Sequence, residues 1–103
     1  MTRGEVWWVE DPGAGRRPHL VLTRDAAIPV LHNVLAVPAT TSIRGIATEV
    51  ALGRVDGMPK ECVLSFDNTT LLPKSFFIEP ICALSPERME SVCLALAHAT
   101  GCR

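Results

Sequence analysis

The chain has 103 residues, of which 48% are hydrophobic and 20% are charged, and its formal net charge is −1 at pH 7. This composition excludes an intrinsically disordered chain, and the near-neutral charge excludes a uniformly basic, histone-like binder of nucleic acids. A chain of this length is expected to form one domain over residues 1–103, with a hydrophobic core of its own.

Short strands separated by turns are predicted along the first half of the chain, because β-branched and aromatic residues alternate with Pro and Gly. The first two strands flank a Pro- and Gly-containing turn at residues 11–15. Pro38 is expected to end the third strand, and a polar loop follows it at residues 40–45. The predicted strands are residues 6–10, 19–23 and 33–37.

The second half is predicted to hold three more strands and one helix. The strands are residues 48–52, 62–67 and 76–84, and Pro80 places the last of them at a sheet edge or a bulge. Ser85 can cap a helix that begins at Pro86, and Gly101 can end it. The expected apolar stripe of this helix is Met89, Val92, Cys93, Leu96 and Ala97. This order of elements predicts a mainly β fold, a small, strongly curved antiparallel sheet or barrel that the C-terminal helix seals on one side.

The cysteines indicate a reduced protein. Cys62, Cys82, Cys93 and Cys102 form no C-x-x-C pair, and the first three lie in apolar patterns, so we expect them in the core. The spacing of Cys93, His98 and Cys102 on a helix points them in different directions, so no metal site is expected. No apolar run has the length of a signal sequence or of a membrane span, which favours a cytoplasmic protein without a membrane partner.

Positive charge is concentrated in the first half, where residues 16–60 contain six Lys or Arg and three Asp or Glu. Arg16 and Arg17 directly precede Pro18, which cannot donate a ladder hydrogen bond and is expected to begin a strand. The backbone of Arg17 is therefore restricted at a strand entrance. The pair is interpreted either as solvated surface charge or as an anion-binding site.

A second segment with anion-binding chemistry follows the third strand. Thr40, Thr41 and Ser42 supply three hydroxyl groups, and Arg44 adds a cation. Hydroxyl groups and free backbone N–H groups at a strand end suit an anionic oxygen. By contrast, nothing in the pattern brings two of the three histidines together, as a histidine-based nuclease requires. The adjacent carboxylates Glu10 and Asp11 face opposite sides of a strand, so no glycosidase-type pair is expected.

Two aromatic pairs allow two interpretations each. Trp7 and Trp8 alternate along a strand, so one ring points inward and the other outward. An outward ring can stack on an RNA base, whereas a core or dimer-interface role is the more common use. The same alternatives hold for Phe76 and Phe77.

Six segments, in order, cover almost the whole chain, namely RGEVWWV (3–9), RRPHLVLT (16–23), VPATTS (37–42), TEV (48–50), CVLSFDN (62–68) and LSPERMESV (84–92). Taken together in this order, they resemble the MazF/PemK family of toxin endoribonucleases. The resemblance implies an SH3-like barrel, a homodimer, and sequence-specific cleavage of single-stranded RNA without a metal ion or other cofactor. It also implies attack by the ribose 2′-OH, which leaves a 2′,3′-cyclic phosphate and a 5′-hydroxyl.

The resemblance assigns catalytic roles to two residues, the arginine of the R-P motif, Arg17, and the threonine after the third strand, Thr40. Expected substrate-binding residues are Arg16, Thr41, Ser42, Arg44 and Asn68. Asn68 stands where many relatives have glutamine, and it either binds a base or fixes a strand end. The turn at residues 11–15 is shorter than in many relatives, which leaves the substrate preference open.

The expected partner is a cognate antitoxin of the MazE type, whose acidic and hydrophobic C-terminal segment occupies the basic groove. Two alternatives remain open at this point. One is a toxin of related fold that binds DNA gyrase and has no enzymatic activity, and the other is an RNA-binding regulator that has lost catalysis.

Overall fold

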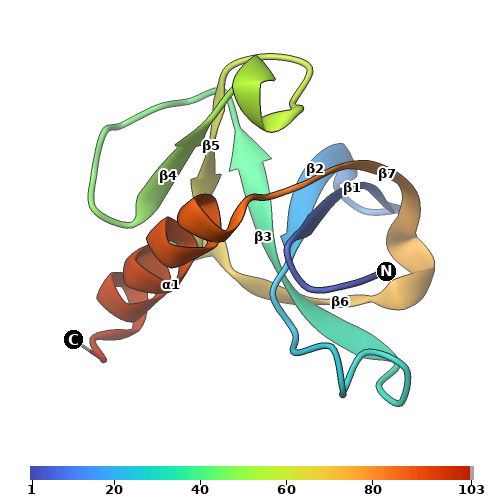
Figure 1. The fold of residues 1–103 in the computed structure, drawn as a ribbon. Coiled ribbons are helices and arrows are strands. Elements are labelled where there is room, and N and C mark those ends of the chain that lie inside the picture. The colour runs from blue at the N-terminus through green and yellow to red at the C-terminus, as the bar shows by residue number, and fades with distance from the viewer. Residues whose placement is uncertain (103) are drawn as a thin grey trace.

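The computed structural model describes residues 1–102 and shows seven strands, three short 3-10 turns and one helix (Figure 1). The strands are β1 (Glu5–Asp11), β2 (Gly15–Val21), β3 (Asn33–Thr40), β4 (Glu49–Leu52), β5 (Cys62–Ser65), β6 (Thr70–Pro73) and β7 (Phe77–Ala83). The 3-10 turns are η1 (Arg54–Asp56), η2 (Phe66–Asn68) and η3 (Lys74–Phe76), and the helix is α1 (Pro86–Thr100).

All pairings in the sheet are antiparallel, and the strand order is β4-β5-β3-β2-β1-β7. The long strand β3 is the central strand of the sheet, because it pairs with three other strands (Figure 1). Its first part pairs with β6, its middle with β2, and its last two residues, Ala39 and Thr40, with β5. A strand that changes partners in this way bends the sheet strongly. The predicted fold class is confirmed, with β4 and β7 as the two ends of an open barrel.

The core lies on both faces of this curved sheet, because successive residues of each strand point to opposite sides. On β2, Leu20 belongs to one buried cluster and Val21 to the other. Helix α1 covers the first cluster through Val92 and Ala95, which are almost fully buried. Burying side chains of this size contributes about 1.5–3 kcal/mol for each large aliphatic residue, so these two clusters hold the strands in register.

The helix begins and ends as expected. The Ser85 side chain accepts a hydrogen bond of 3.2 Å from the backbone N–H of Arg88, and Pro86 occupies the first turn. Gly101 ends the helix with a φ of 72°, a conformation that favours glycine. The buried stripe differs from the prediction at Cys93, which is exposed, because the face that meets the sheet runs through Val92 and Ala95.

Cysteine burial confirms the core prediction only in part. Cys62 is buried and Cys82 is half-buried, whereas Cys93 and Cys102 are exposed. Within residues 1–102, no three His, Cys, Asp or Glu side chains are grouped so as to hold a metal ion. The same part of the chain contains no helix with the length and apolar character to cross a membrane.

Two proline-based strand boundaries were wrong. Strand β2 begins at Gly15, so Arg16 and Arg17 lie within the strand and Pro18 pairs with Trp8 of β1. Pro18 precedes the first residue pair with β3, so no ladder hydrogen bond is needed from its nitrogen on that side. Likewise β3 continues through Pro38, which is the last residue paired with β2 before the strand turns to β5.

In the second half of the chain, one strand was not predicted and one proline lies where it was predicted. Strand β6 was missed, because Thr70–Pro73 is only four residues long and follows a 3-10 turn that the sequence pattern merged with β5. Pro80 lies between two register shifts of the β1–β7 pair, and β7 is an end strand, as its position predicted.

The two tryptophans face opposite sides, with Trp7 packed against a core cluster, and Phe77 is buried beside a half-buried Phe76.

Candidate active site

Arg17 and Thr40 both lie two residues from the last residue pair between β2 and β3, although 22 residues separate them in the sequence. His19 of β2 pairs with Pro38 of β3, and each step back along β2 is a step forward along β3. The pairing with β2 ends there, and Thr40, two residues further along β3, pairs with Val63 of β5. Because side chains two residues apart share a face, Arg17 and His19 project to the same side of the sheet as Pro38 and Thr40.

A cleft of about 460 Å³ opens on this side of the sheet. Its walls come from five strands, the η2 turn, the turn between β1 and β2 and the loop after β3, so segments far apart in the sequence meet there. Polar and charged groups are mixed with a few apolar ones along it. Of the predicted site residues, the cleft contains Arg17, Thr40, Ser42, Arg44 and Asn68, and it also contains Asp11, His19, Ser65 and Thr70.

A second cleft, of about 270 Å³, lies against the same two residues, since Arg17 and Thr40 line both. The remaining predicted residues, Arg16 and Thr41, line this second cleft and are absent from the first. Its other lining residues include Trp8, Lys60 and an apolar part formed by Pro18, Ala39, Met58, Pro59 and Cys62. Arg17 and Thr40 therefore stand at the boundary between two recesses.

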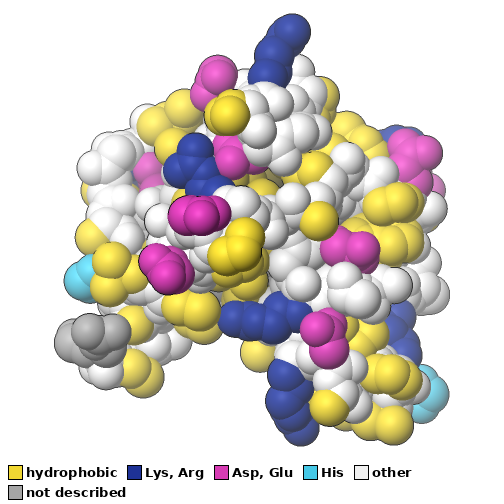
Figure 2. Space-filling view, in the orientation of Figure 1, with side chains coloured by type: hydrophobic (Ala, Val, Ile, Leu, Met, Phe, Trp, Pro, Cys, Tyr) yellow, Lys and Arg dark blue, Asp and Glu magenta, His cyan; other side chains and the backbone are white. Residues whose placement is uncertain are grey.

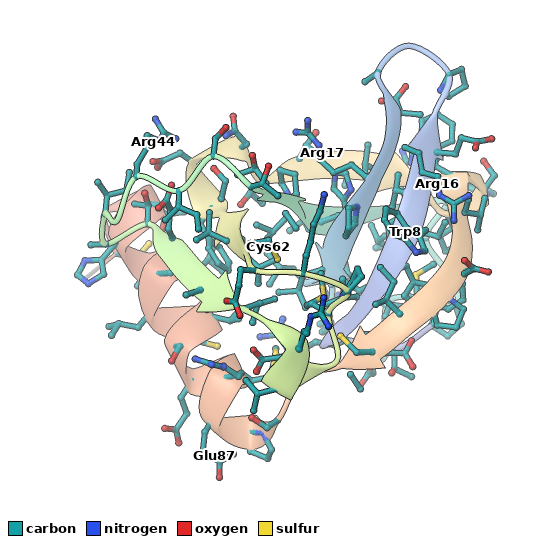
Figure 3. The ribbon with its side chains drawn as sticks, turned by 90° about the horizontal axis from the view of Figure 1, so that it is seen from above. Trp8, Arg16, Arg17, Arg44, Cys62 and Glu87 are labelled. Atoms are coloured by element: carbon teal, nitrogen blue, oxygen red, sulfur yellow. The ribbon has the colours of Figure 1, made fainter. Side chains whose placement is uncertain are left out.

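Arg16 has defined partners in the second cleft. Its guanidinium carbon lies 4.8 Å from the centre of the Trp8 ring, and its Nη2 atom lies 3.2 Å from Oε1 of Glu79. Figure 3 shows Arg16 beside Trp8, with Arg17 between this pair and Arg44. The cations thus form a row along one edge of the molecule. On the different face seen in Figure 2, basic and acidic side chains are interspersed.

The loop after β3 is held by side-chain contacts at both ends. Thr40 Oγ1 accepts a 3.1 Å hydrogen bond from the backbone N–H of Ser42. Glu49 Oε1 accepts hydrogen bonds of 3.0 Å and 2.8 Å from the backbone N–H groups of Arg44 and Gly45. The second oxygen of Glu49 lies 3.6 Å from Arg44 Nε, and this carboxylate side chain is only 3% exposed. Glu49 therefore fixes where the loop carries Arg44 into the cleft.

The protonation of Glu49 agrees with this role. Burial raises the pKa of its carboxyl. Hydrogen bonds from the backbone of Arg44, Gly45 and Ile46, together with the charge of Arg44, lower this pKa by more than burial raises it. The net pKa lies below the ordinary value of 4.5, so the carboxylate is ionised at neutral pH.

Asn68 fixes the end of a strand, one of the two interpretations that the sequence left open, and its role in binding a base stays a prediction. Its side-chain amide donates a 2.8 Å hydrogen bond to Ser65 Oγ at the end of β5, and the same residue lines the first cleft. Its neighbour Asp67 accepts a 2.7 Å hydrogen bond from Thr48 Oγ1, which joins the η2 turn to the loop before β4. Asn68 is thus a fixed polar group on the cleft wall.

His19 is a cleft residue to which sequence reasoning assigned no function. Its spacing of two from Arg17 on one strand is the pattern that would have located it. The residue is 9% exposed, and burial lowers the pKa of its imidazole below the ordinary value of 6.5. The charge of Arg17 lowers this pKa further, while the hydrogen bond to the Arg17 carbonyl and the charge of Asp11 oppose the shift. The imidazole is therefore neutral at pH 7.

Comparison with known proteins agrees with this architecture. Residues 2–100 match the family model described as PemK-like, MazF-like toxin of type II toxin–antitoxin system. The chain is 42% identical to the probable endoribonuclease MazF5 of Mycobacterium tuberculosis over 102 residues, which cover 98% of this chain and 94% of the relative. It is also 42% identical to the probable endoribonuclease MazF2 of the same species over 103 residues, which cover 99% of this chain and 100% of the relative.

Solved structures give the same result. A mycobacterial endoribonuclease in complex with its cognate antitoxin superposes with a TM-score of 0.90 at 31% identity, covering 100% of this chain and 97% of that one. The match to the family model extends over nearly the whole chain, and the similarity in fold is equally extensive. The chain therefore belongs to the PemK-like, MazF-like family of toxins of type II toxin–antitoxin systems.

Proposed function

We propose that this protein is an endoribonuclease that cleaves single-stranded RNA at a phosphate bound between Arg17 and Thr40. The observation that carries the proposal is that Arg17 and Thr40 line both clefts, at the boundary between them. A strand of RNA has one nucleotide on each side of its scissile phosphate, and a recess lies on each side of this pair. The endoribonuclease names of the relatives that are 42% identical to this chain support the same activity.

The chemistry needs little from the protein beyond position and charge. The ribose 2′-OH attacks the adjacent phosphorus and expels the 5′ oxygen, so the products are a 2′,3′-cyclic phosphate and a 5′-hydroxyl. Arg17 offers a planar fork of N–H donors to the phosphorane oxygens and stays charged at any working pH. The Thr40 hydroxyl and the nearby backbone N–H groups bind a non-bridging oxygen. The substrate supplies the nucleophile, and no metal or other cofactor takes part in this scheme.

The remaining residues hold the RNA on either side. In the first cleft, Ser42 and Arg44 meet the phosphate backbone, and Asn68 presents its amide to a base. In the second cleft, Arg16 and Thr41 contact the neighbouring nucleotide. Because Glu79 and Trp8 hold Arg16, its guanidinium is ordered before RNA arrives, which reduces the entropy lost on binding.

The row of cations also suits the other partners that we propose. An antitoxin segment with acidic and hydrophobic residues would meet Arg16, Arg17 and Arg44 and the apolar part of the second cleft, and so exclude RNA. The solved mycobacterial endoribonuclease with its cognate antitoxin supports such a partner. We further propose that the toxin acts as a homodimer in the cytoplasm, where its RNA substrates are.

A cleavage assay tests the proposal and separates it from the two alternatives. Purified protein is incubated with a mixed single-stranded RNA in the presence of EDTA, and the cut ends are mapped by sequencing and tested for a 5′-hydroxyl. We expect discrete cuts with 5′-hydroxyl ends, which are lost in Arg17→Ala. Intact RNA together with inhibition of DNA gyrase would favour a gyrase-binding toxin. Intact RNA that nevertheless binds the protein would indicate a regulator without catalysis.

A further inference from the structure

We propose that His19 is the general base of the reaction, and that its Nε2 atom removes the proton from the attacking ribose 2′-OH. This inference rests on the proposed function, in which the group that accepts this proton is not yet assigned. Three observations carry it, namely the position of the ring in the cleft, the tautomer that the backbone imposes, and the access of the free ring nitrogen to the cleft.

The position follows from the strands. His19 is two residues from Arg17 on β2 and projects from the same face, and both side chains line the first cleft. Thr40 of β3 lines the same cleft, so the three residues border one region. A phosphate at Arg17 and Thr40 would place the adjoining ribose in the same cleft as His19. A base must reach the proton that it abstracts. His19 meets this requirement, because its ring and the ribose would lie in the same cleft on the same side of the sheet.

The backbone selects the tautomer. His19 Nδ1 lies 3.2 Å from the backbone carbonyl oxygen of Arg17. A carbonyl oxygen only accepts hydrogen bonds, so Nδ1 carries the proton and donates it. In a neutral imidazole the other nitrogen, Nε2, then has a free lone pair. The contact also fixes the ring relative to Arg17, the residue that would bind the phosphate.

The free nitrogen is open to the cleft. Over residues 1–102, the one buried side-chain nitrogen or oxygen without a hydrogen-bond partner is Glu49 Oε2. His19 Nε2 has no hydrogen-bond partner in this part of the chain, yet it is not among such buried atoms, so it keeps access to solvent. Because the rest of the residue is almost fully buried, this access is through the cleft. The lone pair therefore faces the space that the substrate would occupy.

The surrounding charges favour a neutral ring before the reaction. Arg17 on the same strand and Arg44 from the loop are the cations of the cleft, and Asp11 of β1 is the anion. The strands that flank β2 contribute uncharged groups beside the ring, Trp7 from β1 and Pro38 from β3. Burial and Arg17 lower the pKa of His19, so the base is available at neutral pH. When the phosphorane gains negative charge, it stabilises the imidazolium that forms beside it.

The proton balance is complete without another reagent. The 2′-OH proton moves to His19 Nε2 while the bond between the 2′ oxygen and phosphorus forms. The bond between phosphorus and the 5′ oxygen then breaks, and the leaving oxygen takes a proton from water. The resulting hydroxide removes the proton from His19, which returns to its neutral form.

The first test uses the unmodified protein. The kcat/KM for cleavage of an RNA that contains the mapped site is measured against pH, and His19 is titrated in the same buffer by NMR. We expect kcat/KM to fall tenfold per pH unit on the acid side, with a midpoint below 6.5 that coincides with the NMR pKa of His19. A midpoint that does not coincide with that pKa would overturn the proposal.

The second test uses variants. His19→Gln and His19→Asn cannot accept a proton but retain an amide donor, and we expect kcat to fall by about 10²–10⁴ with little change in KM. The acid limb, which is the fall of kcat/KM at low pH, should be absent in both variants. Matched controls are His32→Gln and His98→Gln, because both side chains are exposed and neither lines the cleft.

The outcomes separate the two proposals. A His19→Gln protein that is folded by circular dichroism and keeps the wild-type acid limb contradicts the role of His19, while RNA cleavage by the wild type still supports the proposed function. Wild-type protein that cuts no RNA contradicts the proposed function itself. If both variants unfold, the wild-type protein provides the test. Agreement between the midpoint of its acid limb and the NMR pKa of His19 supports the role of His19, and disagreement contradicts it.

Discussion

Replacing Thr40 by valine removes one hydroxyl group and changes little else. Valine has nearly the same shape, and its β-branched side chain suits the end of β3. The hydroxyl has two expected functions, which are to bind a phosphate oxygen and to accept the 3.1 Å hydrogen bond from the backbone of Ser42. Thr40→Val removes both functions, whereas Thr40→Ser keeps both.

The expected magnitudes of the two losses differ. Loss of one donor to a developing oxyanion typically lowers kcat by about 10²–10³. Loss of the hydrogen bond to Ser42, at an exposed site, costs about 0.5–1.5 kcal/mol in the free energy of unfolding. In a chain near 100 residues, a change of this size shifts Tm by roughly 2–10 °C. A fall in kcat of a hundredfold or more in a protein that is still folded therefore reports catalysis and not stability.

The assay measures kcat and KM on a labelled RNA that contains the mapped cut site, with Tm recorded for the same preparations. We expect Thr40→Val to lose at least a hundredfold in kcat and Thr40→Ser to remain within about tenfold of wild type. Thr100→Val serves as a control, because it removes a threonine hydroxyl from helix α1, outside both clefts. If Thr40→Val cleaves as fast as wild type, or if Thr40→Ser is equally inactive, the reasoning is refuted.

Four further predictions concern the loop, pH, the core and salt. Glu49→Ala frees the loop and should lower kcat/KM by up to about 100-fold, whereas Glu49→Gln keeps an acceptor and most of the activity, as steady-state kinetics will show. In urea denaturation, the free energy of unfolding should decrease as the pH is lowered below 6.5, because the unfolded chain protonates His19 more readily than the folded protein does. It should decrease again as the pH is lowered below 4.5 and Glu49 becomes protonated. His19→Gln should abolish the first fall. Leu64→Ala should cost about 2–5 kcal/mol in the same experiment, and exposed Leu94→Ala much less. Arg16→Met should weaken RNA binding and reduce the slope of log K against log salt by about one.

The sequence predicted the class of fold because local chemistry at the ends of its elements is strong. Ser85, Pro86 and Gly101 mark a helix by capping, and the helix ends where they indicate. Prolines within strands misled the boundaries, since Pro18 lies just before the first residue of β2 that pairs with β3, and Pro38 is the last residue of β3 that pairs with β2. Such positions depend on which strand pairs with which, and the local sequence does not contain that information.

The candidate site was predictable in its parts. Arg17 and Thr40 were identified as a pair through resemblance to a family, and in the structure both residues line the same two clefts beside the end of the β2–β3 pairing. His19 was missed because an isolated histidine on a strand has no motif, and only the shared cleft relates it to Arg17. The arrangement of Arg16 against Trp8 and Glu79 likewise depends on three strands meeting in space.

The most direct test of the account is a double-mutant cycle between Arg17 and Thr40, with kcat measured for Arg17→Lys, Thr40→Val and the double variant on one RNA. If both side chains act on the same phosphate, each single change should lower kcat by about 10²–10³, and the double variant should be little slower than the slower single variant. Effects that simply multiply would show that the two residues act independently, and would contradict the proposal of a shared phosphate.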